Sequence, residues 1–300
     1  MAIIGDVPYQ GEDFPSLISS INADPFVKTV VHVGDIKSGE SECLDQHYWD
    51  IRWSFLTFEE PLVYTFGDNE WADCDRDSAG AYDPQERLAK LRDIFFDVPG
   101  STLGGRDMQV ESQPGYPENQ LWQDKDILFA TVHIVGSNNN LKNQDVSPPS
   151  EQTATLSSEY GKRTAANIAW LRGIFSRAFD SDSAGVALFF HADMWKLKDH
   201  FDRENFSGYT EIVQELSRLT EAYARPVVFV SGENHHFRMD PGVPWFAHYG
   251  ANPANNVTQL IVEQGVSLIA DGADQRNTWL RLIADATTEN VFSWEQVVGR

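Results

Sequence analysis

The fold class of this chain is decided by the stretch Thr29-Val30-Val31-His32-Val33-Gly34-Asp35. A nearly continuous apolar run rich in β-branched residues is typical of a strand buried on both faces. The run ends at Gly34, which allows a sharp turn, so Asp35 is expected to follow the strand end directly. His32 lies inside the run and is predicted to be a core residue. The stretch therefore predicts a buried strand with a carboxylate at its C-terminal end.

Four further runs have the same composition, and amphipathic patterns separate them. The apolar runs cover residues 61–66, 126–135, 185–190 and 226–230. Helical spacing of apolar residues covers residues 14–21, 85–96, 164–179 and 209–223. Alternating buried strands and amphipathic helices predict an α/β sandwich with a largely parallel central sheet. His133, inside one of the apolar runs, is also predicted to be a core residue.

The C-terminal part has a different pattern. Residues 257–263, 278–284 and 291–295 alternate apolar and polar side chains, which predicts an antiparallel edge. Residues 100–118 and 137–158 are predicted to be surface loops. Because polar strand ends recur from residue 6 to residue 236, a boundary in that span would split them, and residues 1–300 are predicted to form one domain.

Side chains of the kinds that bind metals recur at the ends of the predicted strands. Five polar turns show this: Gly5-Asp6-Val7-Pro8-Tyr9, Gly34-Asp35-Ile36-Lys37, Gly67-Asp68-Asn69-Glu70-Trp71, His191-Ala192-Asp193 and Gly232-Glu233-Asn234-His235-His236. Taken singly, these residues are explained more readily as helix caps, turn residues or buried histidines. Taken together, carboxylate, carboxamide and imidazole groups at neighbouring strand ends predict a divalent-metal site in the crevice beyond the strands.

Asp35 holds the central position in this set and is the expected bridge between two metal ions about 3.5–4 Å apart. Asp6 would hold one ion from the outer side. The remaining predicted ligands are Asp68 or Asn69, His191, Glu233 and His235. Glu233 and His235 are alternate residues, so in an extended segment both face the same side and His236 points away. The candidates for contact with substrate are Lys37, Asn138, His236 and Arg238. For the two cations among them, simple solvent exposure is the alternative.

The composition narrows the possible partners. The chain has 45 acidic and 23 basic residues, a formal net charge of -22. This charge argues against nucleic acid and anionic membranes as partners, since binding a phosphate backbone needs a basic surface. No apolar run approaches the roughly twenty residues of a membrane span. A small-molecule substrate is expected. The scattered acidic residues indicate a well-solvated surface or a salt-adapted host, and the oligomeric state stays open.

The two cysteines leave a choice open. Cys43 follows the Asp35 turn and Cys74 follows the Asp68 turn, so the two loops could meet and carry a disulfide. Two unrelated thiols are the equal alternative. A disulfide would indicate an oxidising compartment, hence a secreted or periplasmic protein; otherwise a cytoplasmic protein is expected. The sequence shows no signal peptide, and the first predicted strand lies so close to Met1 that the secreted alternative supposes a leader already removed.

With these motifs in this order, the chain resembles the calcineurin-like metallophosphoesterases. That family carries Asp-x-His, Gly-Asp, Gly-Asn-His-Asp/Glu, a lone His and Gly-His-x-His at strand ends. Gly34-Asp35, His191 and His235 match well, and the resemblance covers nearly the whole chain from Gly5 onward. It implies an α/β/β/α sandwich of mixed sheets with flanking helices and a dinuclear metal centre at the C-terminal ends of the strands. The implied activity is hydrolysis of a phosphate mono- or diester by a metal-activated water.

Several residues depart from the family pattern. Pro8 replaces the first His, Asp68 stands at the metal-binding Asn, and Asn69 stands at the His that assists protonation of the leaving group. Glu233 replaces the first His of the last motif. The resemblance thus implies one site made by Asp35, Asp68, His191 and Glu233, and a poorer one made by Asp6, Asp35 and His235. Tyr9 could reach the poorer site, although its spacing in this register matches no tyrosine motif of the related purple acid phosphatases.

Two functional hypotheses follow. Exchange of imidazole for carboxylate favours harder ions such as Mn²⁺, Mg²⁺, Ca²⁺ or iron over an all-nitrogen zinc site. One or two ions are expected, from among Mn, Fe, Zn, Mg and Ca. The favoured hypothesis is a metal-dependent phosphoric ester hydrolase in which Asn69, His191 and His235 are the catalytic residues. The alternative is a pseudoenzyme of the same fold that binds metal or a phosphorylated ligand without turnover.

Overall fold

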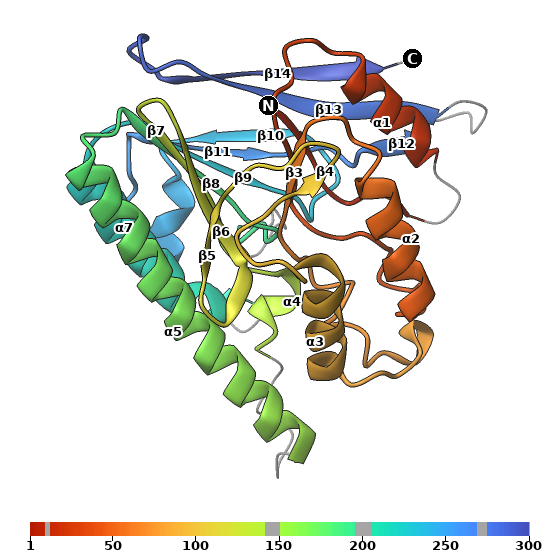
Figure 1. Cartoon of the computed structure of the whole chain (residues 1–300). Helices are drawn as coiled ribbons and strands as arrows, with labels where there is room; N and C mark the ends of the chain where they lie inside the picture. Colours follow the sequence, from red (N-terminus) through yellow and green to blue (C-terminus); the bar gives the residue numbers. More distant parts are fainter. Residues whose placement is uncertain (10–12, 142–150, 196–205, 269–274, 300) are drawn as a thin grey trace.

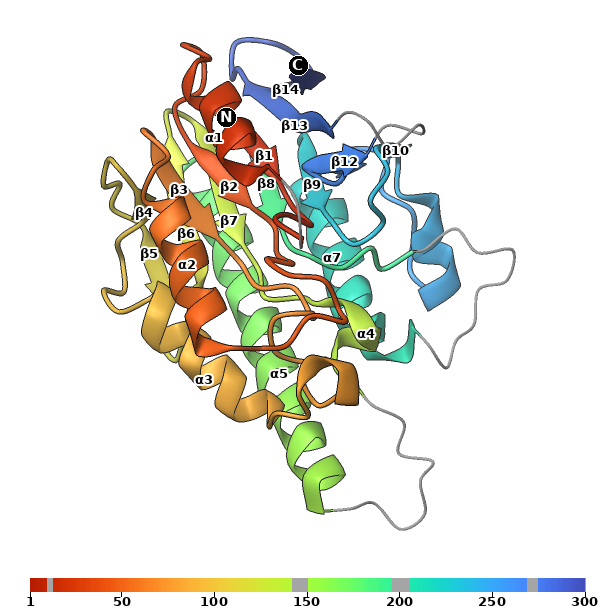
Figure 2. The ribbon, with the colours of Figure 1, turned by 90° about the vertical axis from the view of Figure 1, so that its right-hand side faces the viewer.

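Two mixed β-sheets lie face to face, and helices cover the outer face of each sheet (Figures 1 and 2). The computed structural model describes residues 1–9, 13–141, 151–195, 206–268 and 275–299. None of the helices in these ranges is long and apolar enough to cross a membrane. The order helix, sheet, sheet, helix confirms the predicted α/β/β/α sandwich of mixed sheets.

The first sheet has three parallel strands from the N-terminal part of the chain at its centre. In order along the sheet its strands are β12 (Val266–Leu268), β13 (Gln275–Ala284), β1 (Ala2–Ile4), β2 (Val30–His32), β3 (Pro61–Tyr64) and β4 (Leu103–Gly104), with β14 (Phe292–Gly299) also paired to β13. β1, β2 and β3 are parallel, and β13 runs antiparallel to β1. The C-terminal ends of the three parallel strands therefore point to one edge of the molecule.

The second sheet repeats this arrangement with the later strands. In order they are β10 (Arg238–Pro241), β11 (Val257–Ile261), β9 (Val227–Ser231), β8 (Gly185–Phe189), β7 (Ile127–Thr131), β6 (Tyr116–Asp124) and β5 (Glu111–Gln113). The central strands β7, β8, β9 and β11 are parallel. β8 therefore carries His191, just past its C-terminal end, out of the middle of this sheet.

Helices α1 and α3 start at capping side chains, and the helices as a group divide between the two outer faces. Asp13 accepts a hydrogen bond from the Ser16 amide at the start of α1, and Asp83 caps α3 through the Gln85 amide. The first sheet is covered by α1 (Phe14–Asn22), α2 (Asp45–Phe55) and α3 (Pro84–Phe95). The second is covered by α5 (Glu151–Asp180), α7 (Thr210–Tyr223) and η3 (Pro244–Tyr249). The short helical turns are η1 (Asp77–Ala79), α4 (Gly136–Asn139) and η2 (Ser207–Tyr209).

Side chains alternate along each strand between two cores. In β1, Ile3 packs in the core between the sheets, whereas Ala2 and Ile4 pack under the helices of the first sheet. The same period of two places Val31 and Phe189 between the sheets. Both faces of the central strands are thus buried, which explains why their sequences read as nearly continuous apolar runs.

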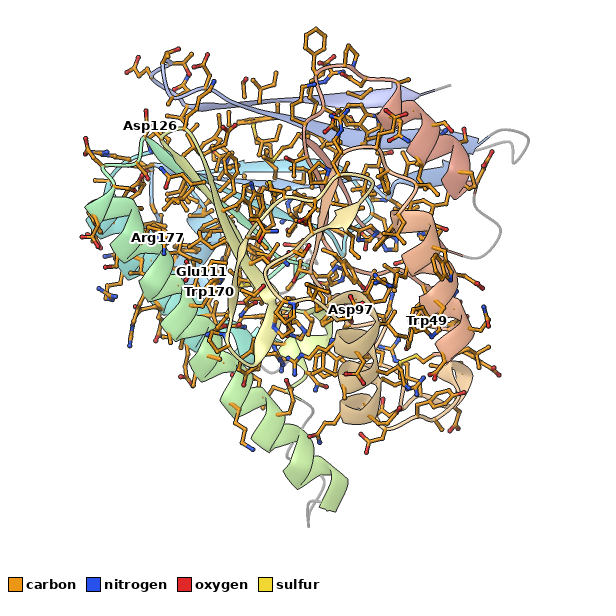
Figure 3. The ribbon with its side chains drawn as sticks, in the orientation of Figure 1. Trp49, Asp97, Glu111, Asp126, Trp170 and Arg177 are labelled. Carbon is orange, nitrogen blue, oxygen red and sulfur yellow. A yellow bond between two sulfur atoms is a disulfide. The ribbon has the colours of Figure 1, made fainter. Side chains whose placement is uncertain are left out.

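The C-terminal half of helix α5 contacts the second sheet (Figure 3). The Trp170 indole donates a hydrogen bond to the Thr131 carbonyl over 3.1 Å. Farther along, Arg177 pairs with Glu111 of β5 at 2.7 Å. These contacts hold the helix against β7 and the edge strand β5.

Some expectations for individual segments are wrong. Residues 151–158, predicted as loop, are the first turns of α5, and their helix-forming residues such as Glu151 and Leu156 explain this. Residues 100–118 contain β4 and β5, because cross-strand pairing outweighs their loop-like composition. β11, expected in an antiparallel edge, does pair antiparallel with β10, but on its other side it pairs parallel with β9. Residues 142–150, also in the predicted loop, lie outside the described residues.

Candidate metal centre

Asp6, Asp35 and His191 converge beyond the C-terminal ends of β1, β2 and β8. One ligand atom from each side chain lies within 4.8 Å of the corresponding atom in the other two. All three residues are buried. The structure therefore brings together three of the predicted ligands, from both sheets, at the edge where strand ends were expected to meet.

His191 is oriented as metal-binding histidines usually are. Its Nδ1 lies 3.0 Å from the Val33 carbonyl oxygen and donates a hydrogen bond to it. This leaves Nε2 facing two carboxylates, 3.1 Å from Asp68 Oδ1 and 3.4 Å from Asp35 Oδ1. A backbone carbonyl that fixes the outer nitrogen in this way sets the tautomer of a ligand histidine.

The buried atoms at this point lack hydrogen bonds. Neither His191 Nε2 nor Asp68 Oδ1 has a hydrogen-bond partner among the described residues, although both are buried. Burial lowers the pKa of His191, but the charges of Asp35 and Asp68 outweigh it and raise that pKa well above the usual range. A cation at this position would replace the extra proton, so the donor set fits a metal ion.

Asp35 lies at the centre of a dense set of contacts. Its Oδ1 accepts from the Asn69 amide at 3.1 Å, and its Oδ2 accepts from Asn69 Nδ2 at 2.5 Å and from the Tyr9 hydroxyl at 3.2 Å. Burial raises the pKa of Asp35 well above its usual range, and the charge of Asp68 adds to the shift. Burial also raises the pKa of Asp6. Clustered buried carboxylates of this kind are unfavourable unless a cation compensates them.

Tyr9 and His235 lie on the outer side of the cluster. The Tyr9 hydroxyl lies 3.2 Å from His235 Nε2 and 3.4 Å from Asn69 Nδ2. His235 Nε2 lies 3.6 Å from Asp6 Oδ1, and the His235 side chain is 41% exposed. The site therefore opens to solvent at His235. The sequence motifs did not define a role for Tyr9, because its contacts are with turns that are far apart in the chain.

The backbone at the site is in a strained conformation. Asp6, Asp35, Glu233 and His235 all have positive φ, at 54°, 59°, 71° and 62°. Left-handed backbone at non-glycine residues costs of order 1–3 kcal/mol each and concentrates at functional sites. The assumption of an extended segment from Glu233 to His235 is therefore wrong, since both residues lie in a turn.

Two glycines make the close approach of these turns possible. A Cβ on Gly67 would lie 2.1 Å from Asp35 Oδ1, and a Cβ on Gly232 would lie 2.7 Å from Asp6 Oδ2. Any side chain at either position would displace a candidate ligand. The Gly in these polar turns thus provides space as well as turn geometry.

Glu70 holds the two acidic turns together, a role that its motif did not indicate. Its Oε1 accepts hydrogen bonds from the Gly67 amide at 2.6 Å, the Asp35 amide at 3.2 Å and the Tyr64 hydroxyl at 2.8 Å. The side chain is buried. Glu70 therefore fixes the backbone that carries Asp35 beside the backbone that carries Asp68.

Asp68 is positioned by a serine in an unusual turn. Ser137 Oγ lies 2.8 Å from Asp68 Oδ2 and 3.0 Å from both oxygens of Asp73. Burial raises the pKa of Asp68, but contacts with His191 and Ser137 outweigh it and hold that pKa below the usual range. Burial and the nearby Asp68 charge raise the pKa of Asp73 to about 7.

The turn that carries Ser137 is left-handed over four consecutive residues. Residues 137–140 have φ of 50°, 56°, 54° and 57°. Arg163, wholly buried on α5, donates to Asn139 Oδ1 at 2.6 Å and to the Asn139 carbonyl at 2.9 Å. Left-handed conformation costs about 1–2 kcal/mol per residue, so such a turn needs a clamp of this kind.

Two of the predicted substrate-binding residues bind other groups of the protein. Lys37 is buried, and its Nζ donates to the carbonyls of Ser38 and Asn69, both at 2.8 Å. Arg238 forms a two-pronged ion pair with Asp193, at 2.9 and 3.0 Å. Their roles toward a substrate stay predictions, but the structure gives each a protein partner.

The other predicted residues lie around the cluster. Glu233 Oε2 accepts from the Asp193 amide at 2.8 Å, and the Glu233 amide contacts Asp6. Asn138 Oδ1 accepts from the Gly208 amide at 2.7 Å. His236 is exposed. The structure thus brings Glu233 next to the cluster, while the three-residue metal group does not include it. His32 and His133 are buried, as predicted.

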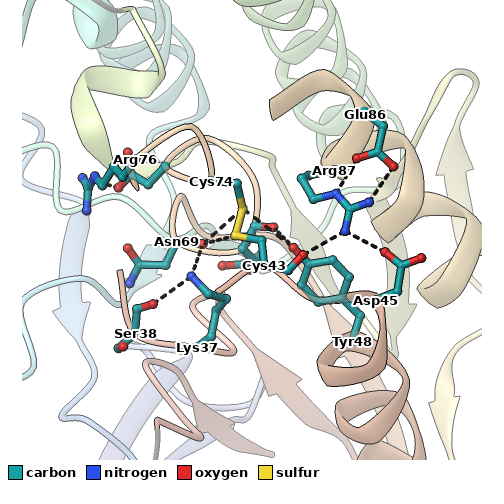
Figure 4. The surroundings of a disulfide bond; sticks show 12 residues. Lys37, Ser38, Cys43, Asp45, Tyr48, Asn69, Cys74, Arg76, Glu86 and Arg87 are labelled. Carbon is teal, nitrogen blue, oxygen red and sulfur yellow. Dashed lines mark hydrogen bonds and ion pairs between the residues drawn. A yellow bond between two sulfur atoms is a disulfide. The ribbon is translucent and has the colours of Figure 1, made fainter. Parts of the chain in front are cut away.

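The disulfide between Cys43 and Cys74 is confirmed, with Cα atoms 5.9 Å apart (Figure 4). The two sulfur atoms lie 3.7 and 3.8 Å from the Asn69 carbonyl oxygen, and this oxygen accepts a hydrogen bond from Lys37 Nζ. The disulfide therefore contacts the backbone of the turn that carries Asp68 and Asn69.

Comparison with known proteins adds little to this picture. No family model matches the chain, and no curated protein matches its sequence. One similar solved structure is the purple acid phosphatase PPD1 from yellow lupin (Lupinus luteus) seeds, with a TM-score of 0.49 and 11% sequence identity. The match covers 98% of this chain and 52% of that one, so the chain spans about half the length of that phosphatase. The chemistry of the site therefore rests on its own residues.

Proposed function

We propose that this chain is a metal-dependent phosphoric ester hydrolase related to the calcineurin-like metallophosphoesterases. The observation that carries the proposal is the orientation of His191. Its Nδ1 is bound to Val33, and its Nε2 faces the buried carboxylates of Asp35 and Asp68 without a hydrogen bond. An imidazole and converging carboxylates at strand ends are a ligand set for a hard or borderline divalent ion.

Asp6, Asp35, Asp68 and His191 would hold the metal, with His235 and Tyr9 on the open side. A bound divalent ion supplies Lewis acidity, which acidifies water and polarises phosphoryl oxygens. The excess of oxygen over nitrogen ligands favours manganese, magnesium, calcium or iron over zinc. One or two ions fit the proposal, with Asp35 as the shared ligand if there are two.

The residues at the open side would bind and orient the ester. Asn69 can donate an N–H to a phosphoryl oxygen, but its carboxamide cannot supply a proton to a leaving group at neutral pH. His235 is the partly exposed imidazole of the site. The buried disulfide supports a secreted or periplasmic location for this activity. Small phosphoesters suit the net charge better than nucleic acid does.

Turnover by defined metal forms tests the proposal. Purified protein is stripped with a chelator, reloaded separately with Mn²⁺, Mg²⁺, Ca²⁺, Fe²⁺ or Zn²⁺, and assayed with 4-nitrophenyl phosphate and bis(4-nitrophenyl) phosphate. We expect hydrolysis by at least one metal form and none by the stripped protein. Tight metal binding with no turnover by any form would support the pseudoenzyme instead, which the residues Pro8 and Asn69 favour because both replace family histidines.

A further inference from the structure

An anionic substrate at this site needs a positive side chain that is accessible to solvent. Lys37 is 1% exposed and bound to two carbonyls. The side chain of Arg238 is only 13% exposed. It contacts both Asp193 and Asp240. The abundance of carboxylates around the cluster makes such a cation more important, since each one repels a phosphoryl group. The two cations nearest the motifs in sequence are therefore poorly placed for this role.

Arg76 lies beside the cluster and keeps an accessible guanidinium. Its side chain is 47% exposed, and Nη2 pairs with Asp73 Oδ2 at 2.5 Å. A Cβ on Gly39 would lie 2.8 Å from Arg76 Nη1 and 2.9 Å from Asn69 Oδ1, so these two atoms lie close to the same point. The other end of the same carboxamide, Asn69 Nδ2, donates to Asp35. One side chain thus separates the Arg76 guanidinium from the central candidate ligand.

The backbone of Arg76 is well anchored. Its amide donates to the Asp73 carbonyl at 3.2 Å, and its carbonyl accepts from the amides of Ala79 and Ala81 at 2.9 and 3.0 Å. Cys74, two residues earlier, is bonded to Cys43. An arginine presented by a fixed loop loses less conformational entropy on binding an anion than one on a mobile segment.

We propose that Arg76 binds the phosphoryl oxygens of the substrate and makes the site selective for phosphomonoesters. This inference rests on the proposed hydrolase function and adds the substrate class. A monoester carries up to two negative charges at neutral pH and presents three non-ester oxygens, which suit the fork of donors on a guanidinium. A diester carries one charge, and its second ester group occupies the place of one of those oxygens. Arg76 therefore discriminates between the two classes.

The test compares Arg76→Gln and Arg76→Lys with the wild type, all loaded with the metal that gives highest activity. Arg225→Gln is the matched control, because Arg225 is 43% exposed and pairs with Asp182 away from the cluster. We expect Arg76→Gln to weaken binding of inorganic phosphate, measured by calorimetry, by about 10- to 100-fold. kcat/KM for 4-nitrophenyl phosphate should fall by a similar factor, mainly through KM, and that for the diester by less than about threefold. Arg76→Lys should retain part of the phosphate affinity and of kcat/KM for the monoester. Arg225→Gln should leave both quantities unchanged.

A second background separates substrate contact from an indirect effect through Asp73. If Arg76 only positions Asp73, the substitution Arg76→Gln should not weaken phosphate binding further in a protein that already carries Asp73→Asn. If Arg76 contacts the substrate, Arg76→Gln should weaken phosphate binding in that protein as well. Equal losses for monoester and diester, or no loss in phosphate binding, would overturn the role of Arg76 while leaving the hydrolase intact. If the wild type neither hydrolyses any ester nor binds phosphate with any metal, both the function and this inference are wrong.

Discussion

At the scale of single residues, Asp35 lies at the centre of the candidate site. It accepts from a backbone amide, a carboxamide and a phenol, and it faces His191. We expect Asp35→Asn to keep the fold, because an amide oxygen still accepts the Asn69 amide, but to lose most bound metal and to reduce activity by orders of magnitude. Elemental analysis and kcat measure the two effects. Asp97→Asn, in a surface pair with Arg52, is the control, and full metal occupancy in Asp35→Asn would remove Asp35 from the ligand set.

If the chain is the proposed hydrolase, Asn69 should determine which leaving groups it tolerates. Without an acid at this position, departure of the leaving group depends on its own stability as an anion. We expect log kcat/KM to fall steeply as leaving-group pKa rises from nitrophenols to simple alcohols, provided that chemistry limits the rate. Asn69→His should flatten this dependence. A shallow slope in the wild type would mean that another group, such as His235 or Tyr9, supplies the proton.

His32 makes stability depend on pH. Burial lowers its pKa from 6.5 to about 4, although its hydrogen bond to Val7 opposes the shift. A lowered pKa in the folded state means that its contribution is present above about pH 6.5 and is lost as pH falls toward 4. We expect the free energy of unfolding to fall by about 2–3 kcal/mol less between pH 7 and 4.5 in His32→Gln than in the wild type. Chemical denaturation measures this, with exposed His236→Gln as control; identical pH profiles would contradict it.

The positions of some site residues could be predicted from the sequence, whereas the roles of others could not. The placement of Asp6, Asp35 and His191 at converging strand ends could be predicted, because a strand followed by a polar turn is a local pattern. The roles of Glu70 and Arg163 could not, because each contacts turns from other parts of the chain. The sequence showed Lys37 and Arg238 near the motifs but not the carbonyls and carboxylates that they contact in the fold.

At the scale of elements, the central strands and the helices with regular apolar spacing could be predicted, whereas β4, β5, α2 and the turn after β7 could not. In α2 the buried residues Tyr48 and Phe55 are interrupted by the exposed Trp49 and Trp53, which blurs the apolar stripe. Three of the four residues in the left-handed run 137–140 are asparagines, which tolerate this conformation better than most, but local preference does not predict four such residues in succession. The conformation of this run depends on Arg163 from a different element.

The turn after β7 acts on the site through one hydroxyl group. Ser137→Ala removes the contact to Asp68 and Asp73 without changing any charge. We expect metal affinity to fall by about 10- to 100-fold, as for other groups that orient a ligand, with little change in melting temperature. Ser181→Ala, whose hydroxyl bonds Arg177 at the far end of α5, is the control. Unchanged metal affinity would mean that Asp68 needs no support from this turn.

At the scale of the whole molecule, the disulfide closes a loop with a sequence separation of 31. Chain entropy gives such a loop roughly 3–4 kcal/mol of stabilisation. We expect the double variant Cys43→Ala, Cys74→Ala to lose about that much free energy of unfolding, and to bind metal more weakly because Asn69 rests against the bond. Intact mass and alkylation of the unfolded, unreduced protein check the bond itself. Two reactive thiols would show that it does not form.

The hydrogen bond from His191 to Val33 can form only late in the synthesis of the chain. It joins residues 158 positions apart. At a ribosomal rate of about 5–20 residues per second, the acidic turn beside Val33 emerges roughly 8–30 seconds before its imidazole partner. During that interval the nascent chain carries the carboxylates without the ring that completes their ligand set. We therefore expect metal to bind only after β8 has been translated. The ion would then bind to the folded protein and not to the growing chain.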